Sequence, residues 1–96
     1  MRNVEFHPFA RAELTAAVEW YRARSASAAA EFGRELQHAI ERISESPLRY
    51  PSTKAGARRF VLLKFPFDVV YRMSGEHVQA LAIAHHARRP GYWQRR

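Results

Sequence analysis

Residues 58–86, RRFVLLKFPFDVVYRMSGEHVQALAIAHH, decide the predicted fold of this chain. They contain three strand-like runs, at residues 58–65, 68–73 and 77–85. The breaks between the runs are only two and three residues long, and one contains proline while the other contains glycine. Because connections this short force neighbouring strands to run in opposite directions, we predict a three-stranded antiparallel meander.

The residues before the meander predict one short strand and two helices. Residues 3–7 alternate apolar and polar side chains, as a short strand does, and Pro8 suits the first turn of a helix. Apolar residues then recur at helical spacing to about residues 22–24. Ser25 can cap a second helix, which Pro47 ends. Helices joined by a link of only two or three residues must be antiparallel neighbours.

The order of elements, β-α-α-β-β-β, predicts one α+β domain over residues 1–96 with two layers. We expect the helical hairpin to cover one face of an antiparallel sheet and the other face to be open and polar. Alternation places Arg58 and Arg59 on opposite faces, but that run is apolar on both sides and does not decide which arginine faces outward. The position of the first strand in the sheet is also left open.

Composition excludes several classes of protein. Apolar residues make up 47% of the chain and aromatic residues 12%, which argues against intrinsic disorder. The chain has no cysteine, so a disulfide scaffold and a cysteine-based metal or redox site are excluded. Its apolar stretches are far shorter than a membrane span needs, and the first residues lack the apolar region of a signal peptide. We therefore expect a soluble cytoplasmic domain without a membrane partner.

The whole chain carries a net charge of +7, and its positive excess lies in the second half. Residues 1–46 contain six lysines and arginines against seven acids, whereas residues 47–96 contain ten against two. A one-sided excess of this kind favours an anionic partner, and nucleic acid is the commonest such partner. The alternatives are a solvated basic surface and a docking site for an acidic protein.

The segment HHARRPGYWQRR, residues 85–96, holds most of the groups that could carry chemistry. Arginine offers a fork for phosphate, Tyr92 and Trp93 offer planes for bases, and histidine can transfer protons near neutral pH. Alternatively, Tyr92 and Trp93 fold back as hydrophobic cover and the arginines form a solvated tail. His85 and His86 would point to opposite faces of a strand and no third ligand follows, so we predict no metal site. We expect no cofactor, because no glycine-rich phosphate loop is present.

Three other polar residues have ordinary structural explanations. Glu13 and Glu19 lie on the first predicted helix, where ion pairs along the helix surface are the default interpretation. Tyr71 lies in the middle of a predicted strand and is expected to pack in the core.

Several short motifs follow one another at characteristic spacing: VEFHP at 4–8, ISESP at 43–47, FPF at 65–67, VYR at 70–72 and HHARRPGYW at 85–93. Together they resemble the RelE/ParE superfamily of toxins from type II toxin–antitoxin modules, over nearly the whole chain. The resemblance implies the same β-α-α-β-β-β fold that the residues predict. It also implies one of two mechanisms, because RelE-like members cut messenger RNA on the ribosome without a metal, whereas ParE-like members poison DNA gyrase.

The RelE-like mechanism would make the protein a metal-independent endoribonuclease. For it, the resemblance assigns catalytic roles to Arg59, Arg72, His86 and Tyr92. Target-binding roles would fall to Arg58, Lys64, His85, Arg88, Arg89 and Trp93. The residues leave both mechanisms open, together with a third interpretation, a non-catalytic nucleic-acid-binding or interaction domain on the same scaffold.

Either toxin mechanism implies a cognate antitoxin as a partner. An acidic, initially disordered antitoxin segment is expected to wrap the domain and to neutralise its basic face by folding on binding. The guanidinium groups of the meander and of the last residues are accordingly expected to gather on the uncovered face of the sheet.

Overall fold

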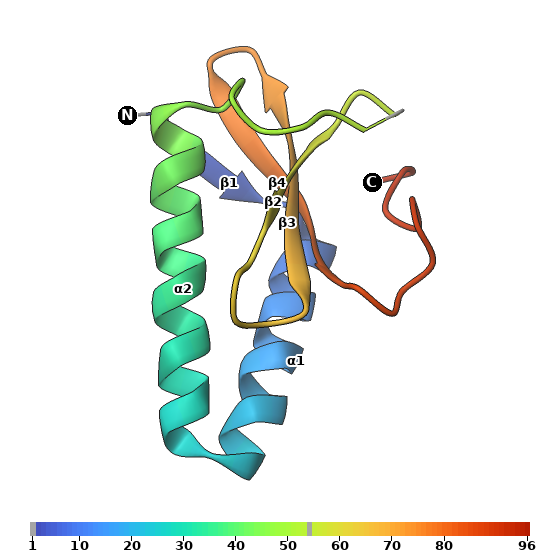
Figure 1. The fold of residues 1–96 in the computed structure, drawn as a ribbon. Coiled ribbons are helices and arrows are strands. Elements are labelled where there is room, and N and C mark those ends of the chain that lie inside the picture. The colour runs from blue at the N-terminus through green and yellow to red at the C-terminus, as the bar shows by residue number, and fades with distance from the viewer. Residues whose placement is uncertain (1, 54) are drawn as a thin grey trace.

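The computed structural model describes residues 2–53 and 55–96, in which two helices pack on a four-stranded sheet (Figure 1). In chain order the elements are β1 (Val4–Phe6), α1 (Pro8–Arg24), α2 (Ala26–Glu45), β2 (Arg58–Val61), β3 (Phe67–Ser74) and β4 (His77–His85). The predicted element order and the two-layer α+β class are therefore confirmed. Neither helix in the described part of the chain has the length and apolarity that a membrane crossing requires.

The two helices begin where local groups satisfy their first backbone donors. Pro8 opens α1, and the Nδ1 atom of His7 accepts a hydrogen bond from the backbone N–H of Phe9 at 3.1 Å. Ser25 is the single residue between the helices, and its hydroxyl accepts from the Ala28 N–H at 3.2 Å. A link this short fixes α1 and α2 as antiparallel neighbours, as predicted.

The strands lie in the order β1-β4-β3-β2. β2, β3 and β4 form the predicted antiparallel meander. β1, however, pairs in parallel with β4, where Val4 lies beside Val78, so the whole sheet is mixed rather than antiparallel. The parallel pairing is possible because the chain passes through both helices and two strands before it returns beside β1.

β2 is shorter than predicted, because the chain turns away from the sheet after Val61. The backbone N–H groups of Leu63 and Lys64 donate to the carboxylate of Glu35 on α2 instead of continuing a strand. At the other end of β2 the outward N–H of Arg59 donates to the Pro51 carbonyl at 3.1 Å. These contacts satisfy donors along the outer edge of the sheet, which would otherwise be open to another strand.

A β-bulge changes the alternation of side chains in β4. The pairing of β3 with β4 shifts by one residue between Val70 and Tyr71, which leaves Leu81 without a partner across the ladder. As a result Val78 and Ile83 both pack in the core beneath the helices. Strict alternation would place these two residues, which are five apart, on opposite faces, and the bulge is what brings them to the same one.

The main core lies between the helices and the sheet. Phe32, Leu36 and Ile43 of α2 pack there with apolar side chains from β3 and β4. Tyr71 is fully buried in this layer, as predicted, and its hydroxyl donates to the Pro47 carbonyl. This bond ties the end of the helical hairpin to the middle of the sheet.

A second apolar cluster lies on the opposite face of the sheet, which we call the second face. Its members are Ala57, Val70, Leu81, Ala82, Ala84 and Trp93. Trp93 belongs to the C-terminal segment (residues 86–96), which Figure 1 shows on the side of the sheet away from α2, and its side chain is only 7% exposed. The expectation of an open second face is therefore wrong at its centre, because the strands carry small apolar residues there and Trp93 covers them.

Candidate functional site

β2 determines which of its two arginines faces outward. Arg59 lies opposite Val70 on the second face, and its side chain is 56% exposed. Arg58 lies opposite Tyr71 on the helix side, where its guanidinium donates to the Tyr50 carbonyl at 2.7 Å. Arg59 is therefore available to a ligand, whereas Arg58 anchors the loop before β2.

Asp68 brings two of the predicted site residues together at the edge of the second face. One carboxylate oxygen lies 2.8 Å from Nε2 of His86, and the other lies 3.9 Å from Nη1 of Arg59. The aspartate is 13% exposed, whereas Arg59 and His86 are about half exposed. Asp68 thus orients an imidazole and a guanidinium that remain open to solvent.

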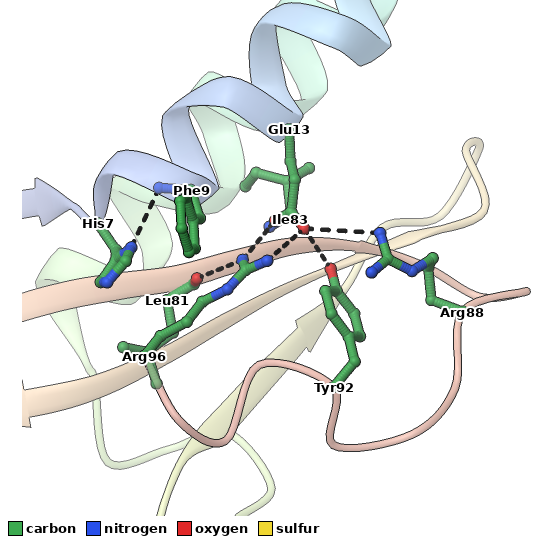
Figure 2. A network of polar contacts seen from close by, with 8 residues as sticks. All are labelled: His7, Phe9, Glu13, Leu81, Ile83, Arg88, Tyr92 and Arg96. Carbon is green, nitrogen blue, oxygen red and sulfur yellow. Dashed lines mark hydrogen bonds and ion pairs between the residues drawn. The ribbon is translucent and has the colours of Figure 1, made fainter.

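Glu13 of α1 connects the helix, β4 and the C-terminal segment, as Figure 2 shows. Its Oε1 accepts from the Ile83 backbone N–H at 3.0 Å and from the Arg96 guanidinium at 2.8 Å. Its Oε2 accepts from the Tyr92 hydroxyl at 2.7 Å and lies 3.9 Å from Arg88. The prediction of an ion pair along the helix surface is wrong for Glu13, because these partners lie 70 residues or more along the chain.

The contacts of Glu13 determine the charge states of Glu13 itself and of Tyr92. Burial raises the pKa of the Glu13 carboxyl, but hydrogen bonds from Arg96, Tyr92 and Ile83 outweigh burial and the net pKa lies below its ordinary value. Burial, reinforced by the hydrogen bond to Glu13, raises the pKa of Tyr92 to about 12. At neutral pH the Tyr92 hydroxyl is therefore protonated and already donates to a carboxylate, which makes it a poor proton acceptor.

The aromatic residues of the C-terminal segment are engaged within the molecule. The Arg88 guanidinium lies 3.8 Å from the centre of the Tyr92 ring, and that of Arg96 lies 5.0 Å from it. Trp93 is buried in the apolar cluster of the second face. The two aromatics thus fold back as the alternative interpretation describes, but its solvated arginine tail is wrong for Arg96, which is 12% exposed and bound to Glu13.

The remaining predicted site residues are dispersed. Lys64 lies beside α2, in the turn after β2. Arg72 lies on β3 and donates to the Arg96 carbonyl at 3.2 Å. His85 points to the helix side, where its ring packs edge-on against Phe67 at 5.0 Å. Within residues 2–53 and 55–96, no three histidine, aspartate or glutamate side chains gather in a way that could hold a metal ion.

A hollow of about 570 Å³ lies between the second face and the C-terminal segment, and we call it the basic hollow. Its charged lining residues, with one imidazole, are Arg59, Asp68, His86, Arg88 and Arg89, and His85 lies at the border that this hollow shares with the helix side. It therefore collects most of the predicted site residues that lie on this side, with three arginines against one aspartate.

A second hollow, the α1 cleft, has a volume of about 420 Å³ and lies between α1 and the neighbouring ends of β3 and β4. Its walls are mostly apolar, formed by Ala16, Ala17, Trp20, Tyr21, Pro66, Phe67 and Ile83, with Glu13, His85 and Arg88 among the polar residues. Trp20 is 53% exposed, and the Arg24 guanidinium lies 3.6 Å from the centre of its ring. The cleft is thus an apolar groove bordered by cations.

Sequence reasoning missed both carboxylates that organise this region. Glu13 lies three residues after Ala10 and four before Ala17, which are the two fully or nearly buried residues of α1. That spacing signals that Glu13 points inward, although it does not reveal the partners. Asp68 shares its face with Val70, so alternation alone would have placed it beside Arg59.

Comparisons with known proteins agree with this architecture. A family model described as "ParE toxin of type II toxin-antitoxin system, parDE" matches residues 4–90. A solved structure described as "Chromosomal ParDE TA system from P. aeruginosa" is similar, with a TM-score of 0.76 and 21% identity, covering 88% of this chain and 96% of that chain. Curated protein sequences give no match. The family match confirms the resemblance noted in the sequence: the chain belongs to the ParE toxin family and is the toxin component of a type II toxin–antitoxin system, with a cognate antitoxin as its partner.

Proposed function

We propose that this toxin inhibits growth by acting on DNA gyrase rather than by cutting messenger RNA, and that an acidic, initially disordered antitoxin segment neutralises it by docking in the α1 cleft. The observation that carries the choice of target is the engagement of Tyr92 with Glu13 at 2.7 Å. The match to the ParE toxin family supports gyrase as the target, because gyrase poisoning is the mechanism that the resemblance implies for ParE-like members.

RNA cleavage by attack of a 2′-hydroxyl needs a proton acceptor, a proton donor and cations around the phosphate. Tyr92 is a poor acceptor at neutral pH, because its pKa is raised to about 12. Trp93 is buried and offers no plane for a base. Arg58 and Arg72 are committed to backbone carbonyls. Of the four residues to which the resemblance assigns catalytic roles, only His86 and Arg59 lie near each other and remain open to solvent, which falls short of the set that the RelE-like mechanism requires.

The target is tested by inducing the toxin in growing cells, with and without the antitoxin encoded beside it. We expect growth arrest, loss of gyrase-dependent supercoiling and gyrase-linked double-strand breaks, while transcripts stay intact. The antitoxin should abolish all of these effects. Cut transcripts with normal supercoiling would contradict the gyrase mechanism and establish the ribonuclease. An absence of toxicity would instead favour the interaction-domain interpretation.

The α1 cleft suits a segment with apolar side chains on one face and acidic side chains around them. Its apolar walls and the half-exposed Trp20 indole offer an anchor for the first kind of side chain. The guanidinium groups of Arg24 and Arg88 lie at its border and can pair with carboxylates. The charge of the cleft's border thus complements the acidic antitoxin segment.

Replacing Trp20 with alanine is expected to weaken antitoxin binding by roughly tenfold to a hundredfold, because an exposed tryptophan in an apolar groove is a typical hot spot. Isothermal titration calorimetry with the cognate antitoxin measures the effect. Leu63→Ala serves as the control, since Leu63 is 93% exposed and lies outside the cleft. Equal losses of affinity in the two variants would contradict docking in the α1 cleft.

A further inference from the structure

The arginines of the basic hollow are weakly committed within the molecule. Arg59 and Arg88 each approach a carboxylate only to 3.9 Å, which is beyond hydrogen-bond distance, and both side chains are about half exposed. Arg89 is exposed and has no ion pair within residues 2–53 and 55–96. Arg59 and Arg89 can therefore turn toward a bound anion at little cost in internal contacts, while Arg88 stays against the Tyr92 ring with its charge beside them.

We propose that the basic hollow binds the phosphate backbone of double-stranded DNA, so that the toxin holds the DNA on which gyrase acts. The inference rests on the proposed function, because gyrase supplies the DNA partner. Guanidinium forks match phosphate oxygens in shape and charge, and neutralising phosphates with arginine provides most of the affinity of backbone contacts.

The hollow favours a duplex over single-stranded nucleic acid because it offers no free aromatic plane. Unstacked bases bind by stacking on aromatic rings. Trp93 is buried, and the Tyr92 ring lies against Arg88 and Arg96. A duplex keeps its bases stacked inside and presents its phosphates, so it needs only the cations.

The hollow also favours DNA over an acidic polypeptide. A disordered segment that folds on binding needs large apolar anchor sites to offset the entropy of ordering, and the half-exposed Trp20 indole that offers one lies in the α1 cleft. Asp68 lies within the hollow, but it is mostly buried and its charge faces His86 and Arg59. The charged groups that remain accessible in the hollow are thus predominantly cationic.

The test measures binding of the purified chain to a short fluorescein-labelled DNA duplex by fluorescence anisotropy, between about 50 and about 200 mM salt. The variant Arg59→Gln/Arg89→Gln removes two charges from the hollow. The matched control Arg22→Gln/Arg34→Gln removes two exposed arginines from the helices, so both variants have the same net charge. Thermal melting confirms that each variant is folded.

We expect the wild type to bind the duplex and to lose affinity steeply as salt increases. The hollow variant should bind at least about tenfold more weakly, and its slope of log K against log salt should fall by about 1.8, which corresponds to two lost phosphate contacts. The helix variant should keep most of the slope. Equal effects in the two variants would overturn the inference, as would stronger binding of single-stranded RNA or of polyglutamate than of the duplex.

A gyrase cleavage assay with the same proteins separates this inference from the proposed function. If the wild type traps gyrase on DNA but does not bind the duplex by itself, the basic hollow is not a DNA site, whereas the gyrase mechanism stands. If the wild type binds the duplex through the hollow but leaves gyrase unaffected, the DNA site stands and the gyrase mechanism fails.

Discussion

Replacing Trp93 with alanine is expected to lower the free energy of unfolding by about 3 kcal/mol, at the lower end of the range for tryptophan in a core. The indole packs on Val70 and Leu81 of the second face and is almost fully buried. Tyr92, the neighbouring large side chain, is held by Glu13 and cannot take its place. The loss lies at the lower end because the C-terminal segment can detach without opening the sheet.

Urea unfolding followed by far-ultraviolet circular dichroism measures this loss, and the melting temperature should fall by more than about 10 °C. Trp20→Ala is the matched control, because it makes the same substitution at a half-exposed position and should cost less than about 1 kcal/mol. Trypsin should also cleave after Arg88 faster in the Trp93 variant, whereas Pro90 protects the bond after Arg89. Equal destabilisation by the two alanine substitutions would mean that the C-terminal segment does not contribute to the folded core.

The element order could be predicted because local signals fix the ends of the helices and the turns between strands. Pro8, Ser25 and Pro47 act within a few residues of themselves, so the helix bounds depend little on the rest of the chain. The partner of β1 could not be predicted, because pairing between β1 and β4 depends on contacts far apart in sequence. The bulge at Leu81 was hidden as well, since a run that is apolar on both faces gives no alternation that would reveal a slip.

The candidate site was predictable only where chain continuity brings residues together. His86, Arg88 and Arg89 follow β4 directly, and they lie at the basic hollow with Arg59. Three other predicted residues do not point into the hollow because of the side of the sheet on which they lie. Arg58 and His85 point toward the helices, and Lys64 lies beside α2. The partners of Glu13 depend on the path of the last residues across the sheet, and no local pattern in the sequence encodes that path.

Replacing Glu13 with alanine is expected to lower the free energy of unfolding by about 3 kcal/mol, because it leaves the Arg96 guanidinium and the Ile83 N–H without their acceptor in a partly buried site. It should also loosen the C-terminal segment. In a Trp20→Phe background, the emission of Trp93 should shift to longer wavelength as the indole meets water. Glu19→Gln on the same helix, at an exposed position, is the control and should leave both stability and emission nearly unchanged.

The contribution of Glu13 should depend on pH in a defined direction. The pKa of Glu13 in the folded protein lies below the ordinary value of 4.5, so the folded state stabilises the carboxylate relative to the protonated acid. The added stability is therefore fully present above about pH 4.5 and is lost as the pH falls through the folded pKa. Glu13→Gln removes this titration, so the stability difference between wild type and Glu13→Gln should be largest near neutral pH and should shrink toward about pH 3. A difference that stays constant over this range would show that the Glu13 carboxylate is not the charged centre that holds Arg96 and Tyr92 in place.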